Sequence, residues 1–202
     1  MKIDYQKELE ELITKLDKRP RVLLHSCCGP CSTQVINFLI PYFDITVLYY
    51  NPNIEPKAEY LKRKNEQIKF INEYKGDFKI NFMDCDYDNE AYLSCVVGLE
   101  NEPEGGARCS KCFMLRLDKT ATLALQHNFD YFGTTLTVSP HKNSQVINRI
   151  GFEIADKYGI KFLPGDFKKN DGYLKSIAYS KEYNLYRQDY CGCHFSNWHL
   201  DK

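Results

Sequence analysis

Three cysteines, Cys27, Cys28 and Cys31, lie within five residues, directly after an apolar run that ends at Leu24. The apolar run predicts a strand, the Gly-Pro pair between the cysteines predicts a turn, and the spacing after Cys31 predicts a helix. The thiols then lie at the carboxyl end of a strand and the N-terminus of a helix, where the helix dipole and free N–H groups favour thiolate over thiol. Single cysteines are usually buried and inert, but three so close together indicate a metal or redox site.

Two further cysteine pairs lie far along the chain, Cys109-x-x-Cys112 and Cys191-Gly-Cys193. A C-x-x-C pair at the start of a helix can direct two thiolates at one zinc ion or iron–sulfur cluster. Together with the first two thiols of the earlier group it would supply four ligands, if the fold brings the two segments together. The pair separated by one glycine can close a strained, easily reduced disulfide or act as a further pair of metal ligands.

Other cysteine and histidine positions are assigned to the core. Cys85 falls in a predicted strand and Cys95 in a predicted amphipathic helix, and neither has a thiol neighbour in sequence. His25 is also predicted to be a core residue. The tetrapeptide Cys28-Gly-Pro-Cys31 matches the active site of thioredoxin-like oxidoreductases, but the additional adjacent cysteine, the two further pairs and the length of the chain argue against that class. Neither a P-loop nor a G-x-G-x-x-G motif is present.

Composition places the chain among ordinary globular proteins, with 202 residues, 43% hydrophobic and 27% charged. The first residues lack the apolar run of a signal peptide, and no stretch is long and apolar enough to span a membrane, so we expect a cytoplasmic protein without a membrane partner. In a reducing compartment, nine cysteines indicate metal ligands or redox groups rather than a disulfide framework.

Strand and helix patterns alternate along the chain. This order predicts an α/β layered fold, Rossmann-like or HUP-like, with a mainly parallel central sheet flanked by helices and a metal site at the carboxyl ends of the strands. We expect one α/β domain over residues 1–202, with an N-terminal helix in 1–19 and a catalytic core in 20–197. The expected helices span about 4–18, 32–40, 56–74, 89–99, 107–127 and 144–158, the expected strands 21–25, 45–50, 79–85, 130–138 and 160–163, and the last forty residues form loops and short helices.

The charges are unevenly distributed although the net charge is zero. Residues 1–104 carry 13 Lys and Arg against 18 Asp and Glu, whereas residues 105–202 carry 14 against 9. The basic half interleaves its cations with aromatic residues, which suits a ligand with phosphates and bases; the alternative is a solvated basic face over core aromatics. The cations are Arg108, Lys111, Arg116, His141, Lys142, Arg149, Lys168, Lys169 and Arg187, and the aromatics are Phe113, Phe167, Tyr173, Tyr186, Tyr190 and Phe195.

At these residues the sequence resembles the epoxyqueuosine reductases of the QueH type, over about residues 20–197. The matching motifs are HSCCGP at 25–30, EPEGGARCSKCF at 102–113, TTLTVSPHKN at 134–143 and YRQDYCGC at 186–193. The resemblance implies an oxidoreductase that reduces the epoxide of epoxyqueuosine to queuosine at the wobble position of tRNA with a GUN anticodon. This is the last step of queuosine synthesis, and the family is cobalamin-independent and uses an electron donor that the sequence does not identify.

The resemblance also implies a [4Fe-4S] cluster held by Cys27, Cys28, Cys109 and Cys112. It assigns Cys191 and Cys193 to a redox-active pair. Relatives often have Asp at the position of Cys31, which is associated with a second metal, so Cys31 is the candidate ligand of an additional mononuclear iron.

The reaction requires electrons, protons and a means of stabilising the departing oxygen. His141, Asp189 and Tyr190 are the candidates for proton delivery, and a metal can assist as a Lewis acid. We expect the substrate to meet Arg108, Lys142, Arg149, Lys168, Lys169 and Arg187. Two other functions stay open: a thiol–disulfide oxidoreductase using Cys28 and Cys31, and an RNA-binding module stapled by zinc.

Overall fold

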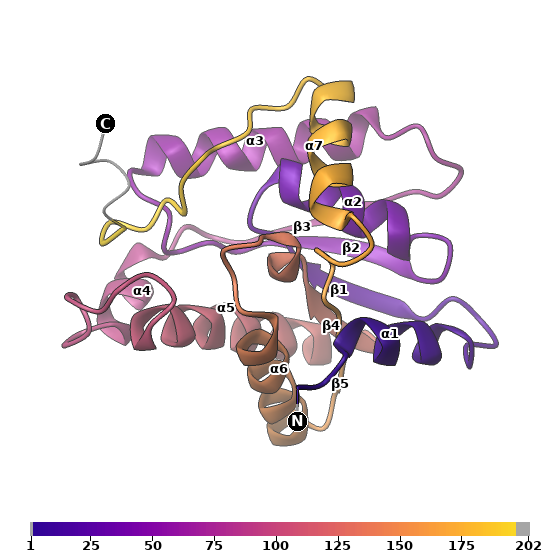
Figure 1. Ribbon diagram of the computed structural model, residues 1–202, viewed down its shortest axis with the longest axis horizontal. Helices are drawn as coiled ribbons and strands as arrows, with labels where there is room; N and C mark the ends of the chain where they lie inside the picture. The colour runs from indigo at the N-terminus through magenta and orange to yellow at the C-terminus, as the bar shows by residue number, and fades with distance from the viewer. Residues whose placement is uncertain (1, 197–202) are drawn as a thin grey trace.

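The computed structural model describes residues 2–196 and contains a five-stranded, all-parallel sheet in the order β3-β2-β1-β4-β5 (Figure 1). Met1 and residues 197–202, which the single-domain prediction includes, lie outside the described residues. The strands are β1 Arg21–His25, β2 Asp44–Tyr49, β3 Asn81–Asp84, β4 Tyr131–Thr134 and β5 Lys161–Phe162. The helices are α1 Tyr5–Ile13, α2 Gly29–Leu39, α3 Lys57–Glu73, α4 Asn89–Cys95, α5 Ala107–Gln126, α6 Ser144–Tyr158 and α7 Gly172–Glu182, with a 3₁₀ turn η1 at Leu136–Val138. The α/β prediction is confirmed.

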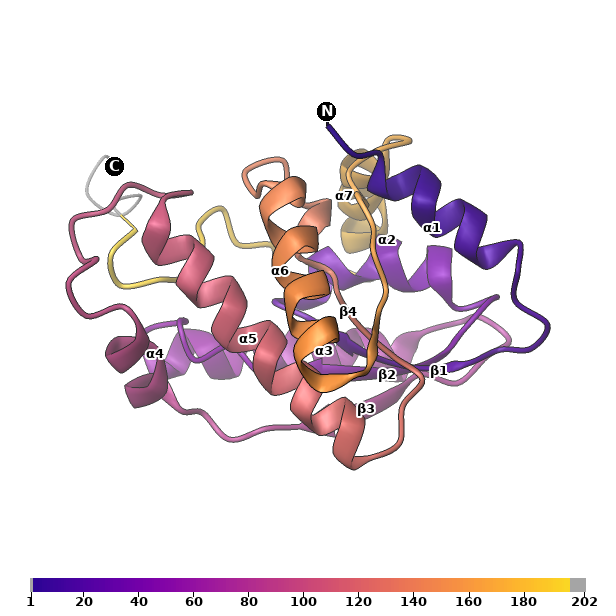
Figure 2. The same cartoon turned by 90° about the horizontal axis from the view of Figure 1, so that it is seen from below.

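Helices cover both faces of the sheet, so the central strand β1 is buried on both sides. Val22 and Leu24 point into one core with α1, α2 and α3, whereas Leu23 points into the other with α5 and α6. This alternation follows from the two-residue period of a strand. Figures 1 and 2 show α2, α3 and α7 on one side of the sheet and α5 and α6 on the other.

Local capping explains where several helices begin. The Asn143 side chain accepts hydrogen bonds from the N–H groups of Gln145 and Val146, so α6 begins where the sequence predicts it. Asp88 caps α4 in the same way. At α2 the cap is a cysteine, because the Cys28 sulfur accepts from the N–H of Cys31 at 3.4 Å and Pro30 occupies the first turn.

Several predicted elements are too long, including the 79–85 and 160–163 strands, which are observed as β3 Asn81–Asp84 and β5 Lys161–Phe162. The 130–138 strand ends at Thr134, because the Thr134 hydroxyl accepts from the N–H of Leu136 and turns the chain into η1. The first helix ends at Ile13 rather than near 18, although Leu16 still packs against the core through a turn. The 89–99 helix ends at Cys95, before Gly98 with its positive φ. The last forty residues, predicted to form loops and short helices, contain the 11-residue helix α7.

The order of the strands places a crevice at the carboxyl end of β1. The chain moves outward from β1 to β2 and β3 and then returns to β4, on the other side of β1. In open parallel sheets, ligands bind where the strand order reverses in this way. The segment after α7 and the start of α5 lie at this same end of the molecule in Figures 1 and 2.

Candidate functional site

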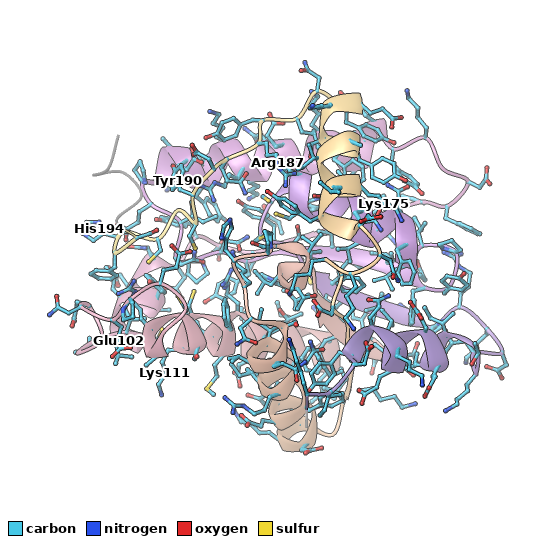
Figure 3. All side chains as sticks on the ribbon, in the orientation of Figure 1. Glu102, Lys111, Lys175, Arg187, Tyr190 and His194 are labelled. Atoms are coloured by element: carbon cyan, nitrogen blue, oxygen red, sulfur yellow. The ribbon has the colours of Figure 1, made fainter. Side chains whose placement is uncertain are left out.

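Two adjoining hollows open at the carboxyl ends of the strands. The first, which we call the main pocket, has a volume of about 120 Å³ and is lined by residues from 27–31, 51–54, 138–142 and 187–191, with Arg63, Glu104, Arg116 and Tyr173. The second, the side pocket, is lined by Tyr92, Glu104, Gly105, Cys109, Cys112, Phe113, Arg116, Cys191, Cys193 and residues from 141–146. Cys191, Arg116 and Lys142 line both. Figure 3 shows Tyr190 and His194 at the same end of the molecule as Glu102 and Lys111.

The first cysteine group is compact. The sulfur atoms of Cys27, Cys28 and Cys31 all lie within 4.8 Å of one another, and those of Cys27 and Cys28 are 3.9 Å apart. Hydrogen bonds with the other two thiols hold the pKa of Cys27 well below its usual value, whereas burial raises the pKa of Cys28 to about 12. The pKa of Cys31 is also raised, first by its hydrogen bond to Cys27. The thiolate form is therefore favoured at Cys27 by its two thiol neighbours, whereas burial and the shared hydrogen bonds favour the thiol form at Cys28 and Cys31.

The second group lies on the first two turns of α5. The Gly105 N–H donates to the Cys109 sulfur at 3.2 Å, and Cys112 is buried. Burial raises the pKa of Cys109 and that of Cys112, to about 12 for Cys112. Both thiols line the side pocket, one turn of helix apart.

The third group is held in an irregular loop by contacts with α3. Arg63 donates to the backbone oxygen of Cys191 at 3.0 Å, and the N–H of Glu55 donates to the oxygen of Gly192 at 2.9 Å. Gly192 has φ +89°, a conformation that favours glycine, and a Cβ there would lie 3.0 Å from the Arg63 guanidinium, which would have to shift. Cys193 is buried, and its sulfur lies 2.8 Å from the hydroxyl of Tyr92.

The tertiary structure places the three cysteine groups around the two pockets, but their sulfur atoms do not form one cluster. All nine cysteines are free thiols. Within residues 2–196, the only group of three or more potential metal ligands whose donor atoms all lie within 4.8 Å of one another is that of Cys27, Cys28 and Cys31. Cys27 and Cys31 line the main pocket, whereas Cys109 and Cys112 line the side pocket. The four-thiol ligand set and the redox pair stay predictions.

A buried cation lies between the thiol groups. Arg116 is only 2% exposed, and its Nη2 has no hydrogen-bond partner among the described residues. Burial alone would lower its pKa, but the thiols of Cys112, Cys191 and Cys27 raise it, and Lys142 shows the same pattern with Cys191 and Cys27. The Nε of Arg116 donates to the backbone oxygen of Cys112 at 3.2 Å. A buried cation with one nitrogen left without a partner is costly, so the donor set fits an anionic group such as a thiolate-ligated iron–sulfur cluster.

His25 is a core residue, as predicted. It is fully buried, and its Nε2 donates to the backbone oxygen of Tyr50 at 3.0 Å while Nδ1 lies 3.0 Å from the Thr134 hydroxyl. Burial and the charge of Arg116 lower its pKa to about 3, so the ring is neutral and ties β1 to β4. Cys85 follows β3 and Cys95 ends α4, and each is partly buried against a core cluster.

The three predicted proton donors, His141, Asp189 and Tyr190, all line the main pocket. Burial raises the pKa of Tyr190, whose ring lies 4.7 Å from the Arg63 guanidinium.

The predicted substrate-binding cations are distributed differently. Lys142 and Arg187 line the main pocket. Arg108 is buried and donates to the backbone oxygens of Leu99, Glu100, Glu102 and Phe195. The other three form ion pairs, Lys168 with Asp166 at 2.8 Å, Lys169 with Asp4 at 2.7 Å and Arg149 with Glu153 at 3.8 Å.

Several pocket residues were missed by reasoning from the sequence. Arg63 and Tyr92 lie within helices, where no local pattern distinguishes them from surface and core positions. Asn51 and Asn53 are buried and line the main pocket. The turn that contains them follows a predicted strand, so its position at this edge of the sheet could be predicted, whereas the burial of these two side chains against the pocket could not.

Together, the fold and the site define an all-parallel α/β protein with a thiol-rich pocket at the strand order reversal. No helix within residues 2–196 is long and apolar enough to cross a membrane.

Comparisons with known proteins narrow this class. The profile of a family described as "Epoxyqueuosine reductase QueH" matches residues 22–199. Three of the curated proteins with that name are similar to this chain. The protein of Staphylococcus epidermidis is 45% identical, covering 96% of this chain and 85% of the relative. That of Streptococcus pyogenes is 46% identical, covering 95% and 77%. That of Thermotoga maritima is 36% identical, covering 87% and 89%. The chain belongs to the epoxyqueuosine reductase QueH family and is an oxidoreductase of queuosine biosynthesis.

Proposed function

We propose that the protein reduces the epoxide of epoxyqueuosine at the wobble position of tRNA with a GUN anticodon. The observation that carries the proposal is the meeting of three cysteine groups and two cations, Arg116 and Lys142, around adjoining pockets. Reducing an epoxide to an alkene consumes two electrons and two protons and releases water. A thiol-rich pocket with titratable groups on its walls suits this balance.

A [4Fe-4S] cluster fits the site with Cys27, Cys28, Cys109 and Cys112 as ligands. Support comes from the buried guanidinium of Arg116, whose Nη2 has no partner among the described residues and whose charge would offset part of the negative charge of four thiolates. When bound, the cluster supplies electrons one at a time. Cys31, whose sulfur lies with those of Cys27 and Cys28, is the proposed ligand of an additional mononuclear iron.

The residues of the chain supply the second electron carrier and the protons. Oxidation of the Cys191 and Cys193 thiols to a disulfide releases two electrons and two protons, the amount that one turnover consumes. An external donor of unidentified chemistry then restores the dithiol. His141, Asp189 and Tyr190 line the main pocket and are the proposed groups that protonate the departing oxygen.

The main pocket also suits a nucleotide taken out of its stack. The rings of Tyr173 and Tyr190 offer flat surfaces for a base, and Lys142 and Arg187 offer positive charge to phosphates. An anticodon loop presents a single-stranded base at little cost in unpairing.

Anaerobic purification followed by iron and sulfide assay tests the cluster, and mass spectrometry of tRNA nucleosides tests the reaction. We expect iron and sulfide in the purified protein and conversion of epoxyqueuosine to queuosine by the reduced enzyme. Persistent epoxyqueuosine would contradict the proposed reaction, and protein without iron that was kept strictly anaerobic would contradict the cluster.

The same measurements separate the two other functions. A thioredoxin-like enzyme would be free of metal and would reduce protein disulfides, but Cys28 is fully buried and its raised pKa makes it a poor nucleophile. A zinc-stapled module would contain zinc and would bind tRNA without any redox activity.

A further inference from the structure

The two thiols of the Cys191–Cys193 pair have different surroundings. Cys191 is partly exposed and lines both pockets, whereas Cys193 is 7% exposed and lines only the side pocket. Their attachments also differ, because α3 holds the backbone of Cys191 through Arg63 and α4 meets the sulfur of Cys193 through Tyr92.

Tyr92 is placed for a specific contact. Its side chain is 1% exposed and packs in a small core cluster with Val96, Cys112 and Cys193. Its hydroxyl lies 2.8 Å from the Cys193 sulfur, at the wall of the side pocket. A buried tyrosine hydroxyl needs a hydrogen-bond partner, and here that partner is a sulfur atom with redox chemistry assigned to it.

We propose that Tyr92 is a positioning residue for the redox pair. Its hydroxyl stabilises Cys193 in the reduced form, and Cys191 is the thiol that meets substrate or reductant. The inference rests on the proposed function, in which this pair undergoes oxidation and reduction. A thiol or thiolate is a better hydrogen-bond partner than a disulfide sulfur, so the contact favours the dithiol.

The redox step is balanced within the pair. Forming the Cys191–Cys193 S–S bond breaks two S–H bonds and releases two protons and two electrons, which reduce the epoxide in turnover or a disulfide reagent in the assay. Losing the Tyr92 hydroxyl should make this oxidation easier. A hydrogen bond contributes about 1 kcal/mol, which corresponds to about a fivefold change in the equilibrium constant.

The test uses the cluster-loaded enzyme and its Tyr92→Phe variant. Each is equilibrated with a series of ratios of reduced to oxidised dithiothreitol, quenched by alkylation, and analysed by mass spectrometry for the Cys191–Cys193 disulfide. We expect the midpoint of Tyr92→Phe to require a dithiol-to-disulfide reagent ratio about fivefold higher than that of the wild type. The matched control is Tyr60→Phe, which removes the hydroxyl of a tyrosine with the same 1% exposure; that hydroxyl donates to the backbone oxygen of Cys85.

The possible outcomes separate this inference from the proposed function. If the wild type forms the disulfide but Tyr92→Phe has the same midpoint, the role of Tyr92 is overturned and the redox pair is not. The same holds if Tyr60→Phe changes the midpoint by an equal amount. A wild type that forms no Cys191–Cys193 disulfide at any ratio overturns the redox pair and this inference with it.

If Tyr92→Phe does not fold, a measurement on the wild type tests the different roles of the two thiols. In the reduced protein, iodoacetamide should modify Cys191 before Cys193, because the Cys193 sulfur is buried and hydrogen-bonded. Modification of Cys193 first would overturn the assignment.

Discussion

The close approach of α2 to α3 makes Gly29 a sensitive position beside the first cysteine group. A Cβ on Gly29 would lie 2.8 Å from the backbone oxygen and 2.9 Å from the backbone carbon of Glu66. Ordinary contact begins near 3.4 Å, so the two helices would have to separate by about 0.6 Å. Because the obstacle is backbone, no side chain can rotate to relieve it.

We therefore expect Gly29→Ala to lower the free energy of unfolding by about 1–3 kcal/mol, the usual cost of overpacking. For a chain of this length, thermal unfolding followed by circular dichroism should show a decrease of about 2–4 °C in Tm for each kcal/mol. The displaced helix carries Cys28 and Cys31, so iron bound per folded molecule should also decrease after anaerobic reconstitution.

Gly159→Ala is the matched control. It adds the same atom at φ +68° with no neighbour within 4 Å, so its cost of about 1–2 kcal/mol comes from backbone strain at the far end of α6. Its iron content should equal that of the wild type. A Gly29→Ala protein with unchanged Tm and unchanged iron would refute the packing argument.

Three further predictions test the site and the core. Cys191→Ser should abolish conversion of epoxyqueuosine while the iron content stays intact; loss of iron would instead identify the pair as ligands. Lys142→Gln should weaken tRNA binding and reduce the slope of log affinity against log salt by about one, whereas Lys157→Gln, on the surface beside Asp118, should change neither. Burial raises the pKa of Tyr50 to about 12, so unfolding should become more favourable as the pH rises above 10, where the unfolded chain ionises this tyrosine first; chemical denaturation at stepped pH measures this.

Much of the fold could be predicted because its signals are local. The helix at 144–158 begins and ends as predicted, since Asn143 caps its first turn and Gly159 in the left-handed conformation ends it. Apolar runs with turn residues at both ends located all five strands. The errors occur at the boundaries of helices and strands, where a single contact can decide at which residue the element ends. The hydrogen bond to the Thr134 hydroxyl, which ends β4, is an example.

The candidate site was predictable only in part. Cysteine spacing identified all three thiol groups, and the strand-turn-helix pattern located the first of them. The spacing did not show that Arg108 would bind backbone oxygens inside the protein while Lys142 would line both pockets. Both are cations within motifs, and only burial distinguishes them.

The sequence alone determined which residue types are present to do chemistry and which short segments present them, because strand, turn and cap preferences act over a few residues. Only the tertiary structure decided which distant segments meet. It placed Arg63 against Cys191 and Tyr92 against Cys193, and it buried the guanidinium of Arg116 between the thiol groups with its Nη2 lacking a partner among the described residues. The physical reason is that these contacts arise from the packing of helices on a twisted parallel sheet, and no local pattern in the chain encodes which side chains that packing brings together.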